Sequence, residues 1–262
     1  MTSLSAIKSP GDQPISPRLT GVGSLRPELE SVFANVPSHA SAADYREAVV
    51  AGNAAGKKSA IGKTWAWKGL KPRYALDRPE TEEFRAFRRA MDDPSPTGRG
   101  YACALMFARL DRLFRDVTLT RLSPLLARPD TMVNRDGVRG EIESRMAAAN
   151  LQWAEGTLVS VTNHMLSAWK DFGLIVGSKE RRTAVVRPTY ATTVFAATLG
   201  RLEGLTDRQI LRSLWFVLLG LSESDVTTLM YDAARAGALG FRAQADVVEI
   251  DLLRAASHEG AA

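Results

Sequence analysis

A run of basic residues in the first third of the chain has the residue types that contact phosphate groups. No acidic residue occurs between Glu47 and Asp77, whereas six lysines and arginines lie in that interval. Positive charge without interspersed carboxylates is typical of a surface that contacts nucleic-acid phosphates. A solvated helix face has the same composition, and that alternative stays open. The candidate DNA-binding residues of this segment are Lys57, Lys58, Lys63, Lys68, Lys71 and Arg73.

Two tryptophans, Trp65 and Trp67, lie inside the basic segment. Residues two positions apart lie on different faces of a helix, so we expect one indole to pack inward. We expect the other to be exposed, where it can lie against a nucleic-acid backbone or a partner protein.

A second candidate surface lies on a helix that we expect between residues 157 and 172. Its apolar residues recur at helical spacing and form one stripe: Leu158, Val161, Met165, Ala168, Trp169 and Phe172. The opposite face carries the candidate DNA-binding residues Ser160, Asn163, His164 and Ser167. Small hydroxyls, an amide and an imidazole suit close approach to phosphates and base edges, although many helices in water carry such a face. Taken alone, His164 is better explained as a surface hydrogen-bonding group than as a metal ligand or a base.

A basic hairpin is expected directly after this helix. Gly173 ends the helix, and the apolar run 174–176 is separated by a polar turn from a second run at 183–188. The turn carries the candidate DNA-binding residues Lys179, Arg181 and Arg182. Two helices followed by a hairpin form the layout of a winged helix, whose second helix enters the major groove while the hairpin contacts flanking DNA.

The sequence lacks the motifs of common catalytic sites. It has no Walker loop, no dinucleotide-binding glycine pattern and no nucleophile elbow. Its one cysteine, Cys103, lies on the apolar side of an expected helix, which favours a small core residue over a nucleophile. The histidines are three scattered residues, which excludes a zinc finger. We therefore expect no catalytic residue, no metal and no cofactor.

The expected fold class is mainly α, with an N-terminal helical domain and two winged-helix-like units that each end in a small β-hairpin. The expected domains are a disordered tail (1–25), a helical domain with a basic helix-turn-helix-like segment (26–128), a first winged-helix-like domain (131–200) and a second winged-helix-like unit (201–255). In the N-terminal domain, Ser41 and Ser59 are expected to cap helices at 42–50 and 60–70, with Pro72 stopping the second. Further helices are expected at 79–91, 101–114, 117–127, 135–148, 206–219 and 223–236, and a second hairpin pairs 239–242 with 247–252.

Charge and composition limit the possible environments. The net charge is +5, but residues 51–100 hold eleven basic and six acidic residues, whereas the last 62 residues hold six basic and nine acidic ones. The second unit is therefore expected to contact protein rather than phosphate. One cysteine excludes a disulfide framework, and the longest apolar run, Leu214 to Leu221, is too short to cross a membrane. Without a recognisable signal peptide, we expect a cytoplasmic protein without a membrane partner.

Several stretches together resemble the BrxA-like proteins of BREX (bacteriophage exclusion) defence systems of bacteria. The segment 52–60 is similar to the family's N-leucine-x-x-K-x-S segment, although Ala54 stands where leucine is more frequent. The helix 156–173 with its basic hairpin and Arg187-Pro188 resembles the C-terminal part of the family. The stretch 233–242 with 247–250 resembles the ending of related defence proteins.

This resemblance implies a helical protein with helix-turn-helix or winged-helix modules that binds double-stranded DNA and catalyses no reaction. It implies other phage-defence subunits as partners: a methyltransferase, a phosphatase-like protein and an ATPase. The family's phosphate-contacting regions correspond to Lys57, Lys58, Lys63 and Lys68, and to the hairpin at 179–182.

Our hypothesis from the sequence is a non-enzymatic DNA-binding component of a phage-defence system that holds duplex DNA through its phosphate backbone. One alternative is a scaffold subunit, whose helix-turn-helix shapes pack against other defence proteins. Another is a winged-helix transcriptional regulator, which would form a symmetric dimer on a palindromic site.

Overall fold

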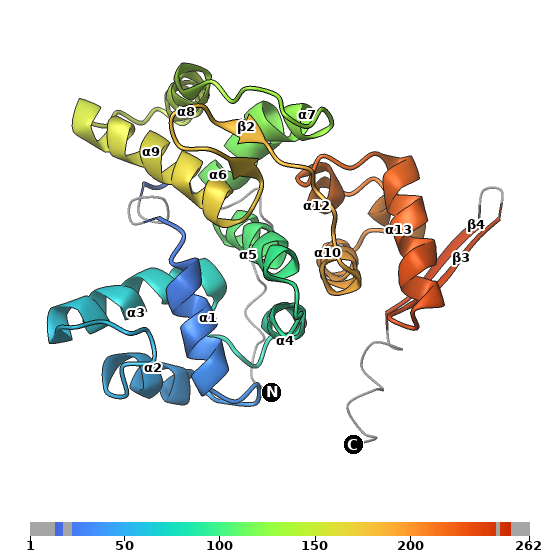
Figure 1. The fold of residues 1–262 in the computed structure, drawn as a ribbon, viewed down its shortest axis with the longest axis horizontal. Helices are drawn as coiled ribbons and strands as arrows, with labels where there is room; N and C mark the ends of the chain where they lie inside the picture. The colour runs from blue at the N-terminus through green and yellow to red at the C-terminus, as the bar shows by residue number, and fades with distance from the viewer. Residues whose placement is uncertain (1–13, 18–22, 245–246, 253–262) are drawn as a thin grey trace.

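The computed structural model describes residues 14–17, 23–244 and 247–252, and it is mainly helical with two small antiparallel two-stranded sheets (Figure 1). The first helices are α1 (Arg26–Asn35), α2 (Ala42–Val50), α3 (Ala60–Tyr74), α4 (Glu82–Met91), α5 (Pro96–Leu110) and α6 (Arg112–Val117). A π-helical turn η2 (Thr118–Leu122) and α7 (Ser123–Leu126) follow, then α8 (Arg135–Ala148), α9 (Glu155–Asp171) and the strands β1 (Ile175–Val176) and β2 (Arg182–Thr183). The C-terminal elements are α10 (Tyr190–Leu202), α11 (Asp207–Ile210), α12 (Leu214–Val217), α13 (Glu223–Arg235), β3 (Gly240–Gln244) and β4 (Val247–Asp251).

The helices α2 and α3 begin where the sequence predicts. Ser41 forms a capping box with Asp44, and the Ser59 hydroxyl accepts a hydrogen bond from the amide of Gly62. The expectation that α3 stops at Pro72 is wrong, because α3 continues to Tyr74. The last turn of α3 is held by two buried side chains, Arg73 and Tyr74, so tertiary packing outweighs the amide donor that proline lacks.

Two helix boundaries in the centre of the chain also differ from expectation. The helix α4 begins after Thr81 rather than at Pro79, because the Thr81 hydroxyl accepts from the amide of Phe84 and so caps the helix. The helix expected at 101–114 is two helices, α5 and α6. Asp111 lies between them in extended conformation and accepts from the amide of Phe114, which ends one helix and caps the next. The helix expected at 117–127 is the end of α6 followed by η2 and α7.

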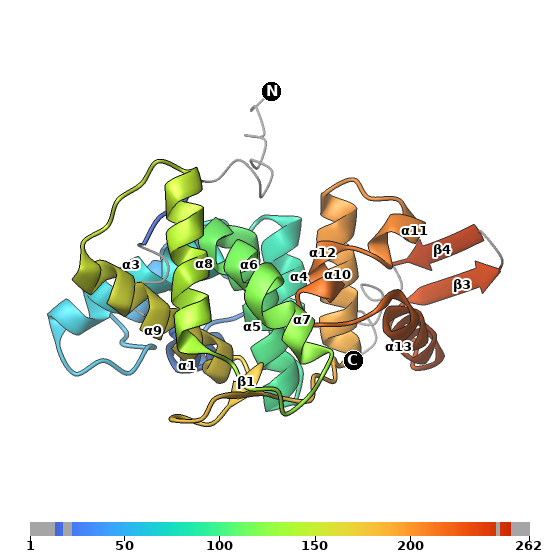
Figure 2. The same cartoon turned by 90° about the horizontal axis from the view of Figure 1, so that it is seen from above.

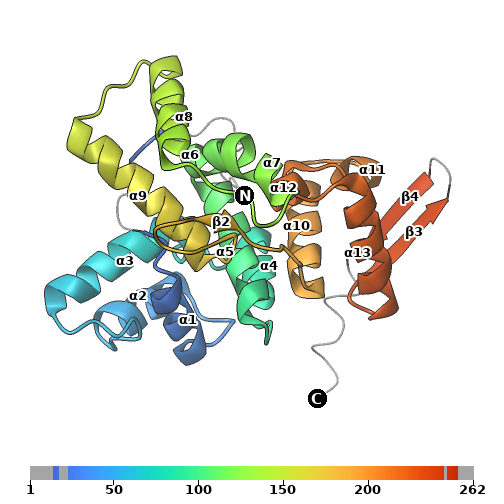
Figure 3. The same cartoon turned by 45° about the horizontal axis from the view of Figure 1, so that its top comes forward.

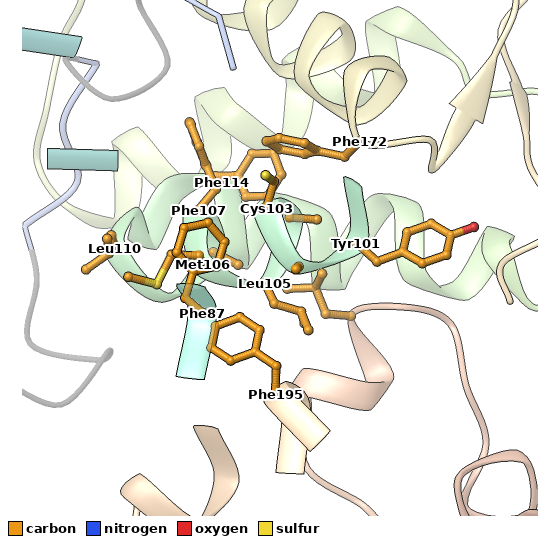
Figure 4. Close-up of a cluster of buried hydrophobic side chains, with 14 of the residues drawn as sticks. Phe87, Tyr101, Cys103, Leu105, Met106, Phe107, Leu110, Phe114, Phe172 and Phe195 are labelled. Carbon is orange, nitrogen blue, oxygen red and sulfur yellow. The ribbon is translucent and has the colours of Figure 1, made fainter. Parts of the chain in front are cut away.

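The helix α5 forms the centre of the core, as its broad apolar face predicts. Every residue from Tyr101 to Ala108 is at most 1% exposed. Phe87 and Phe195 lie on one side of α5, and Phe114 and Phe172 on the other (Figure 4). A helix that is apolar on all sides is stable in water only when other elements cover it completely.

Cys103 on α5 is fully buried, and its sulfur lies 3.5 Å from the sulfur of Met91. Burial raises the pKa of the thiol well above its usual range. Because the thiolate is the nucleophilic form, Cys103 has the properties of a core residue, as predicted.

The helices and the hairpin from α8 to β2 form where the sequence predicts, but the expected second strand at 183–188 is wrong. The strand β2 is only Arg182–Thr183, because Arg182, expected in the turn, pairs with Val176, and residues 184–189 belong to no strand. Asn134 caps α8, and α9 ends at Asp171, two residues before Gly173, whose φ of +77° is a left-handed conformation. The strands β1 and β2 pair antiparallel, and an isolated bridge joins Met132 to Arg182. The local strand order is therefore Met132, β2, β1. The hairpin lies beside the C-terminal end of α9 (Figure 3).

The C-terminal part contains a helix that the sequence analysis missed. The helix α10 is capped by Thr189 and packs against α4 and α5. The spacing of Phe195, Leu199 and Leu202 is a helical pattern that would have predicted it. The helix expected at 206–219 is α11 and α12, with the buried and extended Ser213 between them. The expected cap at Ser222 and the second hairpin are confirmed.

The buried apolar side chains form one cluster that extends from Leu29 to Ile250. The division into domains at 128–131 and 200–201 stays a prediction. Ordered packing begins before residue 26, because Ser24 is buried and its carbonyl accepts a hydrogen bond from the Tyr74 hydroxyl. The other parts of the expected tail, 1–13 and 18–22, lie outside the described residues, as do 253–255 of the second unit.

Two helical glycines give a first test of this packing. A Cβ at Gly100 of α5 would lie 2.6 Å from the Phe172 carbonyl oxygen, whereas a Cβ at Gly140 of α8 would meet open space. We expect Gly100→Ala to lower the free energy of unfolding by about 1–3 kcal/mol through overpacking. The control Gly140→Ala is expected to raise it by up to about 1 kcal/mol through helix propensity. Urea denaturation of both variants measures the difference, and equal effects would contradict the close approach of α5 to α9.

Candidate nucleic-acid interface

Beyond its first turn, the exposed face of α9 carries three polar residues, Asn163, Ser167 and Lys170. The apolar residues predicted to be buried, from Leu158 to Phe172, are at most 5% exposed. Because one side of α9 packs into the core, the polar side is held outward by a rigid element. No other described element covers Asn163, Ser167 or Lys170 enough to bury them. This face can therefore meet a ligand surface without rearrangement.

Ser160 and His164 lie on the flank of α9 and are only half exposed. The Ser160 hydroxyl lies 3.3 Å from Nδ1 of His164. Burial lowers the pKa of His164, and the positive charge of Arg73 lowers it further. The imidazole is therefore neutral at pH 7, which agrees with the interpretation of His164 as a hydrogen-bonding group.

An arginine that the sequence analysis missed extends this face of α9. Arg135, the first residue of α8, donates from Nε to the Asn163 side-chain oxygen over 3.2 Å. It directly follows the helix cap Asn134, and a basic residue at the start of a helix opposes the helix dipole. This unfavourable placement is the one sequence feature that could have indicated that Arg135 has a role in the interface.

The three cations of the first hairpin have different surroundings. Lys179 is exposed and Arg181 is half exposed, and neither side chain has a partner among the described residues. Arg182 is engaged by Asp130: its Nη1 lies 3.2 Å from the carboxylate and 3.0 Å from the backbone carbonyl. Arg128 lies beside the hairpin, because its backbone carbonyl accepts a hydrogen bond from the Thr183 hydroxyl. Arg128 is exposed, but the sequence analysis did not include it because Arg128-Pro129 is typical of a domain boundary. The hairpin tip therefore offers Lys179 and Arg181 as its free cations.

The prediction that Arg73 contacts DNA is wrong. Its side chain is 1% exposed, and its Nη1 donates to the Gly69 carbonyl over 2.8 Å. Burial lowers the pKa of the guanidinium to about 10. The error follows from the expected helix end at Pro72. Because α3 continues past Pro72, Arg73 lies on the same helix face as the buried Ala66 and Leu70.

The lysines around α3 do not form one surface. Lys57 makes an ion pair of 2.5 Å with Glu28, and the Lys71 ammonium lies 3.8 Å from the Asp77 carboxylate. Lys63 is half buried and lies on the opposite side of α3 from Lys68. Lys58 and Lys68 are exposed and have no carboxylate partner among the described residues. These two remain the candidate phosphate contacts of the segment.

The two tryptophans of α3 divide as predicted. Trp67 is partly buried against the core, whereas Trp65 is 61% exposed. The helices α3 and α9 both run from one edge of the molecule toward its centre (Figures 1 and 3). The hairpin β3–β4 lies at the opposite end of the molecule from both helices (Figure 2).

Within the described part of the chain, no three histidine, cysteine, aspartate or glutamate residues are grouped as a metal site requires. None of the described helices combines the length and the apolar character that a membrane crossing needs. No protein-family model matches the chain, and no curated protein matches it either.

Proposed function

We propose that this chain is a non-enzymatic DNA-binding component of a BREX-type phage-defence system, and that α9 and the hairpin β1–β2 hold duplex DNA. One observation carries the proposal. An outward polar helix, α9, is followed directly by a hairpin with free cations at its tip. This is the arrangement in which a winged helix approaches DNA.

The connectivity around α9 supports the proposal. The chain passes from α6 and α7 to the bridge residue Met132, then through α8 and α9 into the hairpin, and Met132 pairs with β2 rather than β1. A winged helix has this order: a helix, a short strand, two helices and two hairpin strands. In that comparison α9 is the helix that enters the major groove.

The chemistry of the surface favours contacts to the DNA backbone over base-specific contacts. Lys170 and Lys179 are cations that can neutralise phosphates, and Ser167 can donate a hydrogen bond to them. Asn163, the residue best suited to reading a base edge, is already engaged by Arg135. We therefore propose binding with weak sequence preference.

The defence context rests on the resemblance of segments 52–60 and 156–173 to BrxA-like proteins.

The second helix–hairpin unit, α10 to β4, is proposed to dock a partner subunit. On α13 and the hairpin strands, five acidic residues outnumber Arg235 and Arg242, which makes phosphate contact there unfavourable: Glu223, Asp225, Asp232, Glu249 and Asp251.

The salt dependence of binding tests the proposed interface. We expect Lys170→Ala with Lys179→Ala to reduce the slope of log K against log salt concentration by nearly 2, because each lost phosphate contact removes about 0.9. Fluorescence anisotropy with a random 30-base-pair duplex, titrated at several salt concentrations, measures the slope.

The matched control is Arg235→Ala with Arg242→Ala, which removes two exposed cations of α13 and β3. These elements lie at the other end of the molecule from α9 (Figure 2). Its slope is expected to equal that of the unmodified protein. An unchanged slope in the Lys170/Lys179 variant would remove α9 and the hairpin from the interface. Absence of duplex binding at low salt would instead favour the scaffold alternative.

A further inference from the structure

A second exposed surface, on α3, takes no part in the duplex contacts proposed above. We define the α3 outer face as Ile61, Trp65 and Lys68, which lie at i, i+4 and i+7 on one side of the helix. Ile61 is 72% exposed and Trp65 is 61% exposed. Ile61 and Trp65 are thus two large, exposed apolar side chains that lie one turn apart on the same side of α3.

The position of α3 leaves this face accessible. Four of the five buried residues of α3 lie in its second half: Gly69, Leu70, Arg73 and Tyr74. The fifth, Ala66, directly follows Trp65 and so points about 100° away from it around the helix axis. The N-terminal end of α3 extends to the edge of the molecule (Figures 1 and 3). A flat ligand can therefore reach the Trp65 ring without moving another element.

The charges beside Trp65 indicate which ligand this is. The Lys68 ammonium lies 6.0 Å from the centre of the Trp65 ring, and the exposed Lys58 lies just before the helix. No described carboxylate forms an ion pair with either lysine. An exposed aromatic ring on a segment that also carries exposed cations suits single-stranded nucleic acid, because the ring can stack on a base while the cations contact nearby phosphates.

We propose that the α3 outer face binds an unpaired DNA base, which stacks on Trp65 while Lys58 and Lys68 contact neighbouring phosphates. The inference rests on the proposed function for the identity of the polymer. A base inside a duplex has both faces covered by its neighbours, so the ligand is a single-stranded segment, an overhang or a flipped nucleotide. A protein partner is less favoured, because two apolar side chains are far smaller than the roughly 800 Å² that each partner buries in a standard interface.

The test compares a fluorescein-labelled dT20 strand with a blunt 30-base-pair duplex in anisotropy titrations of the full chain. We expect Trp65→Ala to weaken dT20 binding at least about fivefold, the effect of losing one base–aromatic stack. Its affinity for the blunt duplex is expected to change less than twofold. Trp65→Tyr is expected to restore most of the dT20 affinity, because it keeps an aromatic ring.

Tyr190→Ala is the matched control, because it removes another exposed aromatic ring, on α10, and is expected to change neither affinity. Unlabelled dT20 is also expected to quench tryptophan emission in the unmodified protein and less so in Trp65→Tyr. Since Trp65 is exposed, thermal melting monitored by circular dichroism should give the same midpoint for all variants.

Equal dT20 affinity in Trp65→Ala and the unmodified protein would overturn the inference. Equal losses on dT20 and duplex would also overturn it, since Trp65 would then be an ordinary duplex contact. Failure of dT20 to bind at all would leave a protein partner as the occupant of this face. Because the duplex test uses Lys170 and Lys179, the proposed function can fail or succeed independently of Trp65.

Discussion

Replacing Arg109 by alanine will lower the free energy of unfolding by about 3–5 kcal/mol, the typical cost of leaving a buried charge without its partner. Arg109 on α5 and Glu83 on α4 are paired through Nε and a carboxylate oxygen, with side-chain exposures of 6% and 1%. Without the guanidinium, the Glu83 carboxylate would stay buried with no opposite charge in contact. Urea denaturation measures the loss.

The same guanidinium connects parts of the chain that are far apart in sequence. Its Nη1 lies 3.0 Å from the Glu203 carboxylate, which in turn accepts a 3.0 Å hydrogen bond from the indole of Trp215. Removing Arg109 therefore affects the packing of α4, α5 and the C-terminal elements together. The loss is expected to appear in one unfolding transition.

Two variants separate the charge effect from general loss of packing. Arg212 and Glu223 form an ion pair of 2.7 Å in which both side chains are exposed. Because water screens this pair, Arg212→Ala should lower the free energy of unfolding by less than about 1 kcal/mol. The double variant Arg109→Met with Glu83→Gln removes both charges and should lose clearly less stability than Arg109→Ala. A similar loss in both would contradict the unpaired-charge explanation.

Asp111→Asn will make the stability of the protein less dependent on pH between pH 4 and pH 8. Asp111 is fully buried at the start of α6, and burial raises its pKa from 3.8 to about 7, although the amide of Phe114 and the charge of Arg73 oppose the shift. In this range the folded state holds a proton that the unfolded state has lost. The unmodified protein therefore loses stability through this group as pH rises, and the loss is complete above about pH 7.

The expected size of this effect is about 4 kcal/mol, from the difference between the folded and unfolded pKa. Asparagine keeps the oxygen that accepts from the Phe114 amide over 2.9 Å, so the helix cap is retained. Relative to the unmodified protein, Asp111→Asn should gain stability from pH 4 to about pH 7, and the difference should then level off toward pH 8. Denaturation curves at unit pH steps measure this difference.

The control is Asp44→Asn at the capping box of α2, where hydrogen bonds from Ser41 lower the pKa of the carboxyl. A lowered pKa confines titration to acidic solution, so this variant should differ from the unmodified protein by a constant amount between pH 5 and pH 8. A constant difference for Asp111→Asn over pH 4 to 8 would contradict the raised pKa.

The sequence by itself determined the features that depend on neighbouring residues. The caps at Ser41, Ser59, Asn134 and Ser222 are local hydrogen bonds, and each was predictable from a polar side chain at the start of a periodic stretch. The two hairpins follow Gly173 and Gly237, whose left-handed conformations suit glycine best. The apolar stripe of α9, and with it the outward direction of Asn163 and Ser167, follows from helical periodicity alone.

Tertiary structure decided which charged groups reach solvent. Arg73 and Lys68 are five residues apart on one helix, yet the core covers the first and not the second. Lys57 is engaged by Glu28, and Asn163 by Arg135, through contacts between residues 29 and 28 positions apart. Such contacts cannot be predicted from neighbouring residues, because burial and ion pairing depend on segments that only folding brings together.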